Sequence, residues 1–361
     1  MLTPEQVQSK TISLLRFPLI VAVVFIHCTL EGALPAPTPL YQTLVHIIKE
    51  TFCRIAVPLF FFMSGFLFFY KRDFNRTVYA EKLRKRARTL LVPYLLWNAL
   101  FILFFWTAQG LFPQMFTGSA AIIRDCSPTE LALLFWGTTT YIYPIDYPLW
   151  FVRDLMVVML LSPIVFLLLS RGKQAGLCLL GLLFLVSSSE NWNTPLHFPI
   201  GFSTTALFFF SFGAYYSIHG RLFTEAFRKA GWPAAAACII LFAASNMTAG
   251  TVEWASTITH RAALIAGIVA VVCFGRWGVE REKFRPVPFL WSATFFIYAY
   301  HGFFSSAINK IPVRLFPDAP AVLILLFNFA TVAILCLLGA AVYKLLERIC
   351  PRFCALLCGG R

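Results

Sequence analysis

The chain has 361 residues, of which 59% are hydrophobic and only 13% are charged, and its mean hydropathy is +0.75. A soluble domain carries about a quarter charged residues, so this composition excludes a water-soluble protein. The apolar runs are about 20 residues long, as a membrane-spanning helix requires, and they lack the alternation of barrel strands. The composition therefore predicts an all-α, polytopic integral membrane protein.

The formal net charge of +14 would also suit a nucleic-acid-binding protein. The basic residues, however, form short clusters between apolar runs, as they do in the cytosolic loops of membrane proteins. We therefore expect no nucleic-acid partner. A basic face of this kind is suited to anionic membrane lipids or to a phosphorylated cosubstrate.

The apolar runs predict ten transmembrane helices. The first run is not expected to be a cleaved signal, because Arg16 lies inside it and Glu31 and Pro35 follow it. Segment 129–144 is interrupted by three threonines and Pro144, which favours an interfacial or re-entrant piece over a span. The ten predicted spans cover residues 12–30, 52–70, 89–107, 148–169, 174–189, 202–218, 231–247, 261–276, 287–305 and 321–343.

The distribution of positive charge predicts the orientation. Of the 30 Lys and Arg residues, 22 fall in the tails and connections of one side, and the positive-inside rule assigns that side, with both termini, to the cytosol. Residues 1–361 then form a single transmembrane domain with a basic cytosolic loop, 71–88, and a short cytosolic tail, 344–361. Arg16 lies within the first span, and the opposite side holds Lys49, Arg54, Arg124, Arg153, Arg261, Lys310 and Arg314.

The ten cysteines include no CxxC pair, so the sequence predicts no metal site. Four of them lie inside apolar runs and are expected to be small buried hydrophobes: Cys178, Cys238, Cys273 and Cys336. Three more recur at four-residue spacing in the tail and predict an apolar stripe at the membrane interface: Cys350, Cys354 and Cys358.

Arg16 and His27 are polar residues inside the first span, where a charge costs a few kcal/mol or more. Eleven positions separate them, which on a helix leaves them within ~20° of one face and ~16 Å apart along the axis. His27 is a candidate general base, oriented by Glu31 four residues later. Alternatively, Arg16 extends to the cytosolic headgroups, and His27 is only an interhelical hydrogen-bond donor.

Two further basic features have a functional and a structural interpretation. Arg54 opens the second span and could neutralise an acidic acceptor, pair with Glu50 or Glu31, or be an ordinary interfacial arginine. The segment 82–88, which includes Arg84, Arg86 and Arg88, could either anchor the topology or bind the phosphates of a nucleotide-bearing cosubstrate.

The outer ends of two later spans carry further candidates. Arg153 and Asp154 follow Trp150 at the start of the fourth span. Adjacent residues on a helix point in different directions, so these two need not pair with each other, and we expect each to pair across helices. Tyr298 and His301 near the end of the ninth span are candidates for substrate contact, with an interfacial aromatic belt as the alternative.

Several of these pieces together resemble the acyltransferase family 3 membrane proteins. An arginine and a histidine with ten residues between them stand in the first span, and further matching segments follow in the same order over nearly the whole chain. Within this family, the chain resembles the stand-alone O-acetyltransferases of bacterial surface glycans, including the enterobacterial-common-antigen type. The matching positions are Arg16 and His27, Arg54 to Gly65, Arg88 to Tyr94, Leu149 to Phe151, and Tyr298 to His301.

The resemblance implies ten helices in a bacterial inner membrane and acetyl-coenzyme A as the donor cosubstrate. It implies that His27 is catalytic and Arg16 essential, with Arg84, Arg86 and Arg88 facing the coenzyme.

Our hypothesis is an O-acyltransferase that acts on a hydroxyl of a cell-surface glycan or its lipid-linked precursor, directly or through a covalent relay. A solute transporter and an assembly scaffold remain as alternatives. The acceptor side is expected to include Arg54, Trp150, Arg153, Tyr298 and His301.

Overall fold

The computed structural model describes residues 2–30, 38–71, 73–116, 123–137, 142–187, 201–284, 287–316 and 318–360. Within these ranges every regular element is helical and no strand occurs, which confirms the all-α prediction. The principal helices of the first half are α1 (Pro4–His27), α2 (Pro39–His46), α3 (Ala56–Phe69), α4 (Arg76–Arg86), α5 (Val92–Leu111), α6 (Pro128–Leu133), α7 (Trp150–Leu160) and α8 (Ser162–Val186).

The second half of the chain continues the same architecture. Its helices are α9 (Thr204–Ile218), α10 (Phe223–Ala226), α11 (Gly231–Thr248), α12 (Glu253–Glu280), α13 (Pro288–Leu315), α14 (Ala321–Ile349) and α15 (Pro351–Leu357). Short π or 3-10 turns complete the described elements: η1 (Ile47–Phe52), η2 (Cys53–Ile55), η3 (Ala87–Leu91), η4 (Pro113–Phe116), η5 (Ile123–Asp125) and η6 (Tyr147–Leu149).

Seven helical stretches of the described residues are long and apolar enough to cross a membrane, which supports an integral multi-pass protein. The count of ten stays a prediction. The predicted spans 148–169 and 174–189 both reach into α8, whereas 202–218 and 287–305 fall on α9 and α13, which are not among the seven. The seven stretches are Pro4–His27, Pro39–Phe69, Arg76–Leu111, Ser162–Val186, Gly231–Thr248, Glu253–Glu280 and Ala321–Ile349.

The helical stretches that contain the second and third predicted spans begin earlier in the structure than the sequence predicts. Helical structure starts at Pro39 and continues through η1 and η2 to the end of α3. The basic segment expected to be a loop is helical from Arg76, because the Asn75 side chain caps the first turn and η3 leads directly into α5. The basic side chains therefore lie on the first turns of a long helical stretch, and the helix fixes the direction of each.

The described part of the connection between the third and fourth predicted spans contains only short helices. Among the described residues of segment 129–144 the one helix is α6, whose start at Ser127 is a capping box with Glu130. This agrees with a segment that does not cross the membrane.

The α8 helix changes direction at Lys173. The backbone there leaves helical geometry, with φ 47° and ψ −124°, so two helical segments meet at this residue. At this break Gly176 lies against the carbonyl of Leu168, and a Cβ built on Gly176 would be 2.6 Å from that oxygen. The break matches the expected boundary between the fourth and fifth spans.

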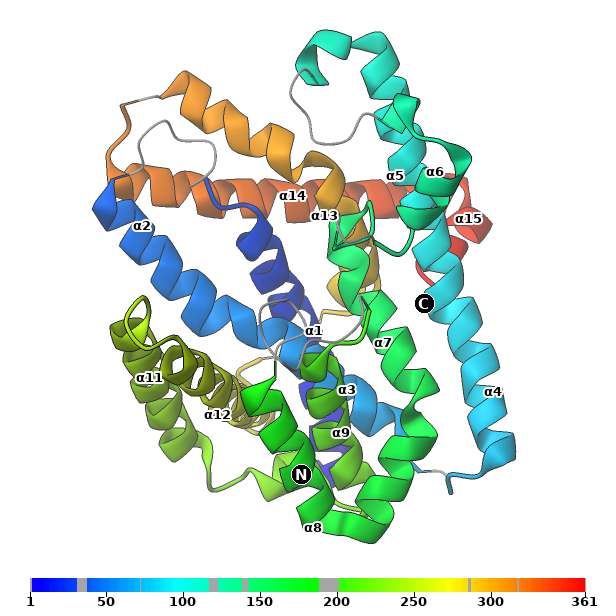
Figure 1. The fold of residues 1–361 in the computed structure, drawn as a ribbon, viewed down its shortest axis with the longest axis vertical. Coiled ribbons are helices and arrows are strands. Elements are labelled where there is room, and N and C mark those ends of the chain that lie inside the picture. Colours follow the sequence, from blue (N-terminus) through cyan, green and yellow to red (C-terminus); the bar gives the residue numbers. More distant parts are fainter. Residues whose placement is uncertain are drawn as a thin grey trace.

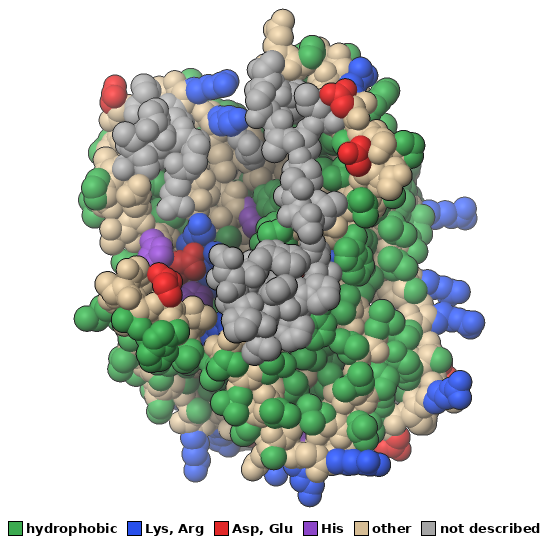
Figure 2. Space-filling model, in the orientation of Figure 1, with side chains coloured by type: hydrophobic (Ala, Val, Ile, Leu, Met, Phe, Trp, Pro, Cys, Tyr) green, Lys and Arg blue, Asp and Glu red, His purple; other side chains and the backbone are tan. Residues whose placement is uncertain are grey.

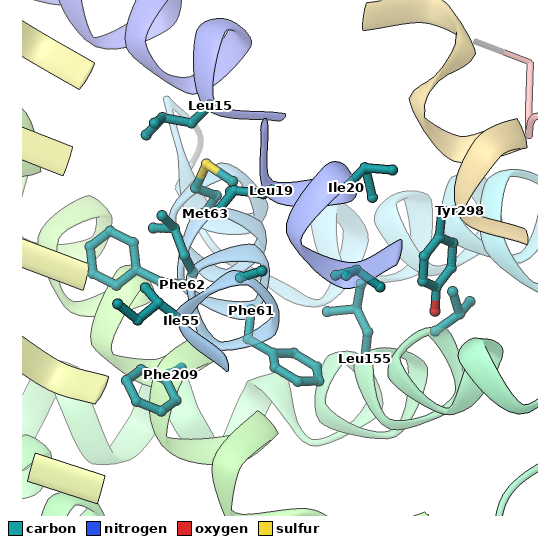
Figure 3. Close-up of a cluster of buried hydrophobic side chains, with 14 of the residues drawn as sticks. Leu15, Leu19, Ile20, Ile55, Phe61, Phe62, Met63, Leu155, Phe209 and Tyr298 are labelled. Atoms are coloured by element: carbon teal, nitrogen blue, oxygen red, sulfur yellow. The ribbon is translucent and has the colours of Figure 1, made fainter. Parts of the chain in front are cut away.

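The α1 helix runs through the middle of the molecule (Figure 1) and packs against α3, α12, α13 and α14. Its first turn is held by a capping box between Thr3 and Gln6. Figure 3 shows the core around it, in which side chains from α1, α3, α7, α9 and α13 converge, among them Leu19, Phe62 and Leu155. The main apolar core thus includes side chains from the first and the last helices of the chain.

The cysteine prediction holds in part. Cys238 and Cys336 are buried and Cys273 is partly buried, but Cys178 is exposed on α8. In the tail, Cys354 and Cys358 are buried, because α15 packs against α5 and Trp97 Nε1 donates to the Leu357 carbonyl over 3.0 Å. The tail stripe therefore faces protein, and only Cys350 is exposed.

The α3 and α9 helices approach so closely that their backbones touch. A Cβ on Gly65 would lie 1.9 Å from the Phe210 carbonyl oxygen, and one on Gly213 would lie 1.8 Å from that of Phe62. Small residues permit this kind of contact between membrane helices. Both glycines are therefore required by packing rather than by backbone conformation.

We expect Gly213→Ala to lower the stability of the detergent-solubilised protein by about 1–3 kcal/mol, because the added methyl group must separate α3 from α9. Thermal unfolding followed by circular dichroism measures the loss. Gly172→Ala is the matched control, since the nearest atom to its Cβ position is 4.0 Å away. Equal melting temperatures for the two variants would contradict the packing account.

Candidate active site

Arg16 and His27 both lie on α1, and each lines a different cavity. The first, here called the arginine cavity, has a volume of about 340 Å³ and is lined by Arg16, Arg86, Trp291 and Ser292 among others. The second, here called the histidine cavity, has a volume of about 320 Å³, and His27 is part of its wall. The helix thus presents one predicted residue to each.

The arginine cavity holds two guanidinium groups. The Arg16 guanidinium carbon lies 5.3 Å from the centre of the Trp291 ring, a favourable cation–π distance. Arg86 lines the same cavity, and its positive charge acts on that of Arg16. Two like charges beside one cavity repel each other, so an anion bound between them would be stabilised by both.

The histidine cavity has a mixed charged and aromatic wall. Arg54 and Glu50, four residues apart, both line it and form an ion pair, with Arg54 Nε 3.0 Å from a Glu50 carboxylate oxygen. Trp150, His260 and Arg261 also line it. Figure 2 shows histidine, acidic and basic side chains gathered in a hollow on one face of the molecule. Such a wall offers both hydrogen bonds and stacking surfaces to a polar ligand.

The two cavities adjoin. Four residues line both of them: Val23, Val57, Phe151 and Tyr298. The Tyr298 hydroxyl donates a hydrogen bond to the Pro148 carbonyl, which fixes the ring at the boundary. Arg16 and His27 lie on one helix, as the sequence predicts, but they do not share a single cavity: they line two cavities that meet at a largely apolar boundary.

Two π-helical turns direct side chains toward these cavities. The η1 turn, Ile47–Phe52, carries Glu50 and precedes Arg54, and η3, Ala87–Leu91, follows Arg86 directly. A π turn shifts the helical register by one residue and is frequent at functional sites. Neither turn is evident from the sequence pattern.

Two aromatic rings lie beside His27 at the end of α1. The His27 ring centre lies 4.8 Å from that of Tyr147, in an edge-on arrangement, and 5.4 Å from that of His301. The Tyr147 hydroxyl and Ser305 Oγ are 3.2 Å apart, and His301 Nδ1 lies 2.6 Å from the Tyr298 carbonyl oxygen. His27 thus has one side toward the cavity and the other toward a buried polar layer.

The structure brings together some of the predicted residues and not others. Arg54, Trp150 and Tyr298 line the histidine cavity with His27. Of the three arginines predicted to face the coenzyme, Arg86 lines the arginine cavity, whereas Arg84 and Arg88 are exposed and line neither of these two cavities. His301 is buried behind His27 and is not part of either lining. Glu31, the predicted partner of His27, lies outside the described residues.

The structure pairs Arg153 and Asp154 with each other, which sequence analysis did not expect. The two residues are buried and pair with each other, with 2.9 Å between Arg153 Nε and Asp154 Oδ1. A long arginine side chain can fold back toward its neighbour, and burial makes that pairing favourable over leaving either charge alone. Arg153 also donates to the carbonyls of Trp136 and Ile142, over 2.5 and 3.0 Å, which ties the outer connection to α7.

Sequence analysis did not single out several residues of the site. His260 and Arg261 line the histidine cavity, although the sequence places them at the end of an ordinary span. Asp146 is fully buried, and its carboxylate oxygens have no hydrogen-bond partner among the described residues. The sequence feature that could have indicated Asp146 is its position directly before Tyr147 and Pro148, at the start of a predicted span, because an acidic residue there requires an explanation.

No group of three or more His, Cys, Asp or Glu side chains suited to a metal ion occurs in the described part of the chain.

Comparison with known proteins gives two matches. A family model described as an acyltransferase domain matches residues 10–342. The chain is also 31% identical over 218 residues to the succinoglycan biosynthesis protein ExoH of Rhizobium meliloti (strain 1021). That alignment covers 59% of this chain and 55% of the relative. No solved structure matches the chain.

We expect Arg153→Met to destabilise the protein by about 3–5 kcal/mol, because it leaves the buried Asp154 carboxylate without its arginine. Adding Asp154→Leu should recover part of this loss, and a double-mutant cycle in unfolding experiments measures the coupling. Arg54→Met is the control: Arg54 is 47% exposed, so its pair with Glu50 should contribute less than about 1 kcal/mol. Equal losses for Arg153→Met and Arg54→Met would argue against a structural role for the buried pair.

Proposed function

Because the chain belongs to the acyltransferase family whose model it matches, we propose that it is a membrane O-acyltransferase. It transfers an acetyl or similar acyl group from cytosolic acyl-coenzyme A to a hydroxyl of a cell-surface glycan or its lipid-linked precursor. The name of the Rhizobium relative, a succinoglycan biosynthesis protein, supports a glycan acceptor. The observation that carries the proposal is the pair of adjoining cavities.

The arginine cavity has the chemistry of a donor site. Arg16 and Arg86 offer two guanidinium groups for the phosphates of coenzyme A. The ~16 Å between Arg16 and His27 along α1, calculated from the helical rise, suits a long donor with phosphates at one end and a thioester at the other. The thin pantetheine arm would pass the boundary formed by Val23, Val57 and Phe151.

The histidine cavity has the chemistry of an acceptor site. Trp150 and Phe151 provide flat surfaces for a sugar ring, and Arg54 and Glu50 provide hydrogen bonds to its hydroxyls. Arg261 is occupied with the backbone carbonyls at the end of α8, including that of Phe184 over 2.6 Å, so its part is to hold the wall in place.

In the proposed reaction, His27 removes the proton of the acceptor hydroxyl as its oxygen attacks the thioester carbonyl carbon. The carbon–sulfur bond then breaks, and the proton held by His27 passes to the departing thiolate. The products are an ester and free coenzyme A. The chain itself forms no covalent bond in this scheme.

We infer the orientation of the protein in the membrane from the distribution of its Lys and Arg side chains. Lys and Arg side chains project along the lower and right edges of the molecule (Figure 2). The N-terminus and α4 lie in that part of the view (Figure 1). We propose that this side faces the bacterial cytosol, with both termini and the arginine cavity, in a single domain of ten spans in the inner membrane.

Arg86→Gln should raise the KM for acetyl-coenzyme A at least tenfold, because it removes one of the two cations that line the donor cavity. Release of free thiol by the purified protein in the presence of a glycan acceptor measures the rate. Arg84→Gln is the matched control, with the same charge change on an exposed neighbour, and should change KM less than threefold. A larger effect at Arg84 than at Arg86 would reject this donor site.

His27→Ala should reduce acyl transfer by about 10²–10⁴-fold through loss of the general base, while the affinity for acetyl-coenzyme A changes less than threefold. Calorimetry on the detergent-solubilised protein measures the affinity. Full activity in this variant would remove the catalytic role. Wild-type protein that moves solute across vesicles but releases no thiol would instead indicate a transporter, and absence of donor binding would indicate a scaffold.

A further inference from the structure

His301 lies directly behind His27 in the interior. It has no exposed surface, and the planes of the two rings differ by 31° at a centre-to-centre distance of 5.4 Å. His301 belongs to α13 and His27 ends α1, and these two helices pack together. Because His301 lines neither cavity, it is placed to contact His27 rather than the acceptor.

The surroundings of His301 fix which nitrogen carries its proton. Nδ1 lies 2.6 Å from the Tyr298 carbonyl oxygen, and a carbonyl can only accept a hydrogen bond. The neutral ring therefore has its proton on Nδ1 and a lone pair on Nε2. That Nε2 is buried and has no partner among the described residues, although a buried acceptor without a donor costs about 1–3 kcal/mol.

His27 is the neighbour best placed to supply that donor. Two imidazoles joined by one N–H···N hydrogen bond have ring centres roughly 5 Å apart, since ~3 Å between the nitrogens adds to about 1 Å within each ring. The observed separation is within a small side-chain rotation of that value. A neutral His27 has one N–H to give and one lone pair for the acceptor hydroxyl.

Two of the other polar groups nearby are already engaged. The Tyr147 hydroxyl is within hydrogen-bond distance of Ser305, and the Tyr298 hydroxyl donates to Pro148. Asp146, whose carboxylate oxygens have no partner among the described residues, lies against Gly302, where a Cβ would be 2.8 Å from its Oδ1. The remaining charged groups that act on His27 are Arg54 and Lys49, from the side of η1 and η2.

We propose that His301 is the positioning residue of His27: its Nε2 accepts the His27 N–H and turns the opposite His27 nitrogen toward the histidine cavity. This inference rests on the proposed acyl transfer. When His27 takes the proton of the acceptor hydroxyl, the resulting imidazolium keeps its second N–H on His301, and that proton does not leave His27. His301 thus stabilises the charged intermediate and undergoes no bond change itself.

The test compares two substitutions at His301 with a control. His301→Phe keeps a flat ring but removes the acceptor, and should lower kcat about 100-fold while the KM for acetyl-coenzyme A changes less than threefold. In His301→Gln, the amide can donate to the Tyr298 carbonyl and accept from His27, so its kcat should be at least tenfold higher than that of His301→Phe. His219→Phe is the control. Like His301, His219 has a buried Nε2 without a partner among the described residues and lines neither cavity.

Each outcome bears on a distinct claim. Equal kcat values for His301→Phe and His301→Gln, or an unchanged kcat in both, would overturn the positioning role. Donor affinity, measured by calorimetry, reports whether each variant is folded at the arginine cavity. If His301→Phe does not fold, His301→Gln is compared with His301→Asn instead. The Asn side chain is too short to reach both partners, so His301→Asn should not restore kcat. Wild-type protein without transfer activity would count against the proposed function itself, and not against the His27–His301 contact.

Discussion

The free-energy cost of placing a charge in an apolar interior separates the polar residues of this bundle into two groups. Some are satisfied by the protein itself. Arg276 is only 5% exposed and pairs with Glu225 and Glu280 at 2.9 and 2.8 Å, and it also donates to the Thr224 carbonyl. Arg153 is satisfied in the same way by Asp154 and two carbonyls. Arg16 and His27 differ because each lines a cavity, where a ligand could reach it. This difference between paired and cavity-facing side chains supports the proposed site, since all four residues lie on helices of the same bundle.

The sequence was sufficient for those features that depend on local composition. Long apolar runs predicted the helices, and the eleven-residue spacing of Arg16 and His27 predicted that one helix carries both. The interruption of segment 129–144 likewise predicted a piece too short to span. In each case the governing interaction lies within one or two turns of the residue concerned, which is the range over which a sequence pattern carries information.

The features that the sequence did not reveal depend on contacts between distant segments. Arg84, Arg86 and Arg88 are equivalent as a sequence pattern, but of the three only Arg86 lines either of the two cavities, because the direction of each side chain depends on how α4 and η3 pack. His27 and His301 stand at opposite ends of the chain and meet only because α1 packs on α13. The Arg153–Asp154 pair was missed for another reason: helical geometry separates adjacent Cβ atoms, but a long arginine side chain in a low-dielectric site overrides that separation.

The boundary between the two cavities has a consequence for how an acyl donor would be used. A single open cavity would let water reach the thioester beside a general base, and hydrolysis would compete with transfer. Here Val23, Val57 and Phe151 line both cavities, as does Tyr298, whose hydroxyl donates to the Pro148 carbonyl. In the proposed reaction, the pantetheine arm of the donor would occupy this largely apolar boundary and displace water from it. The phosphates of the donor would then stay in the arginine cavity and the acceptor in the histidine cavity, with the thioester beside His27.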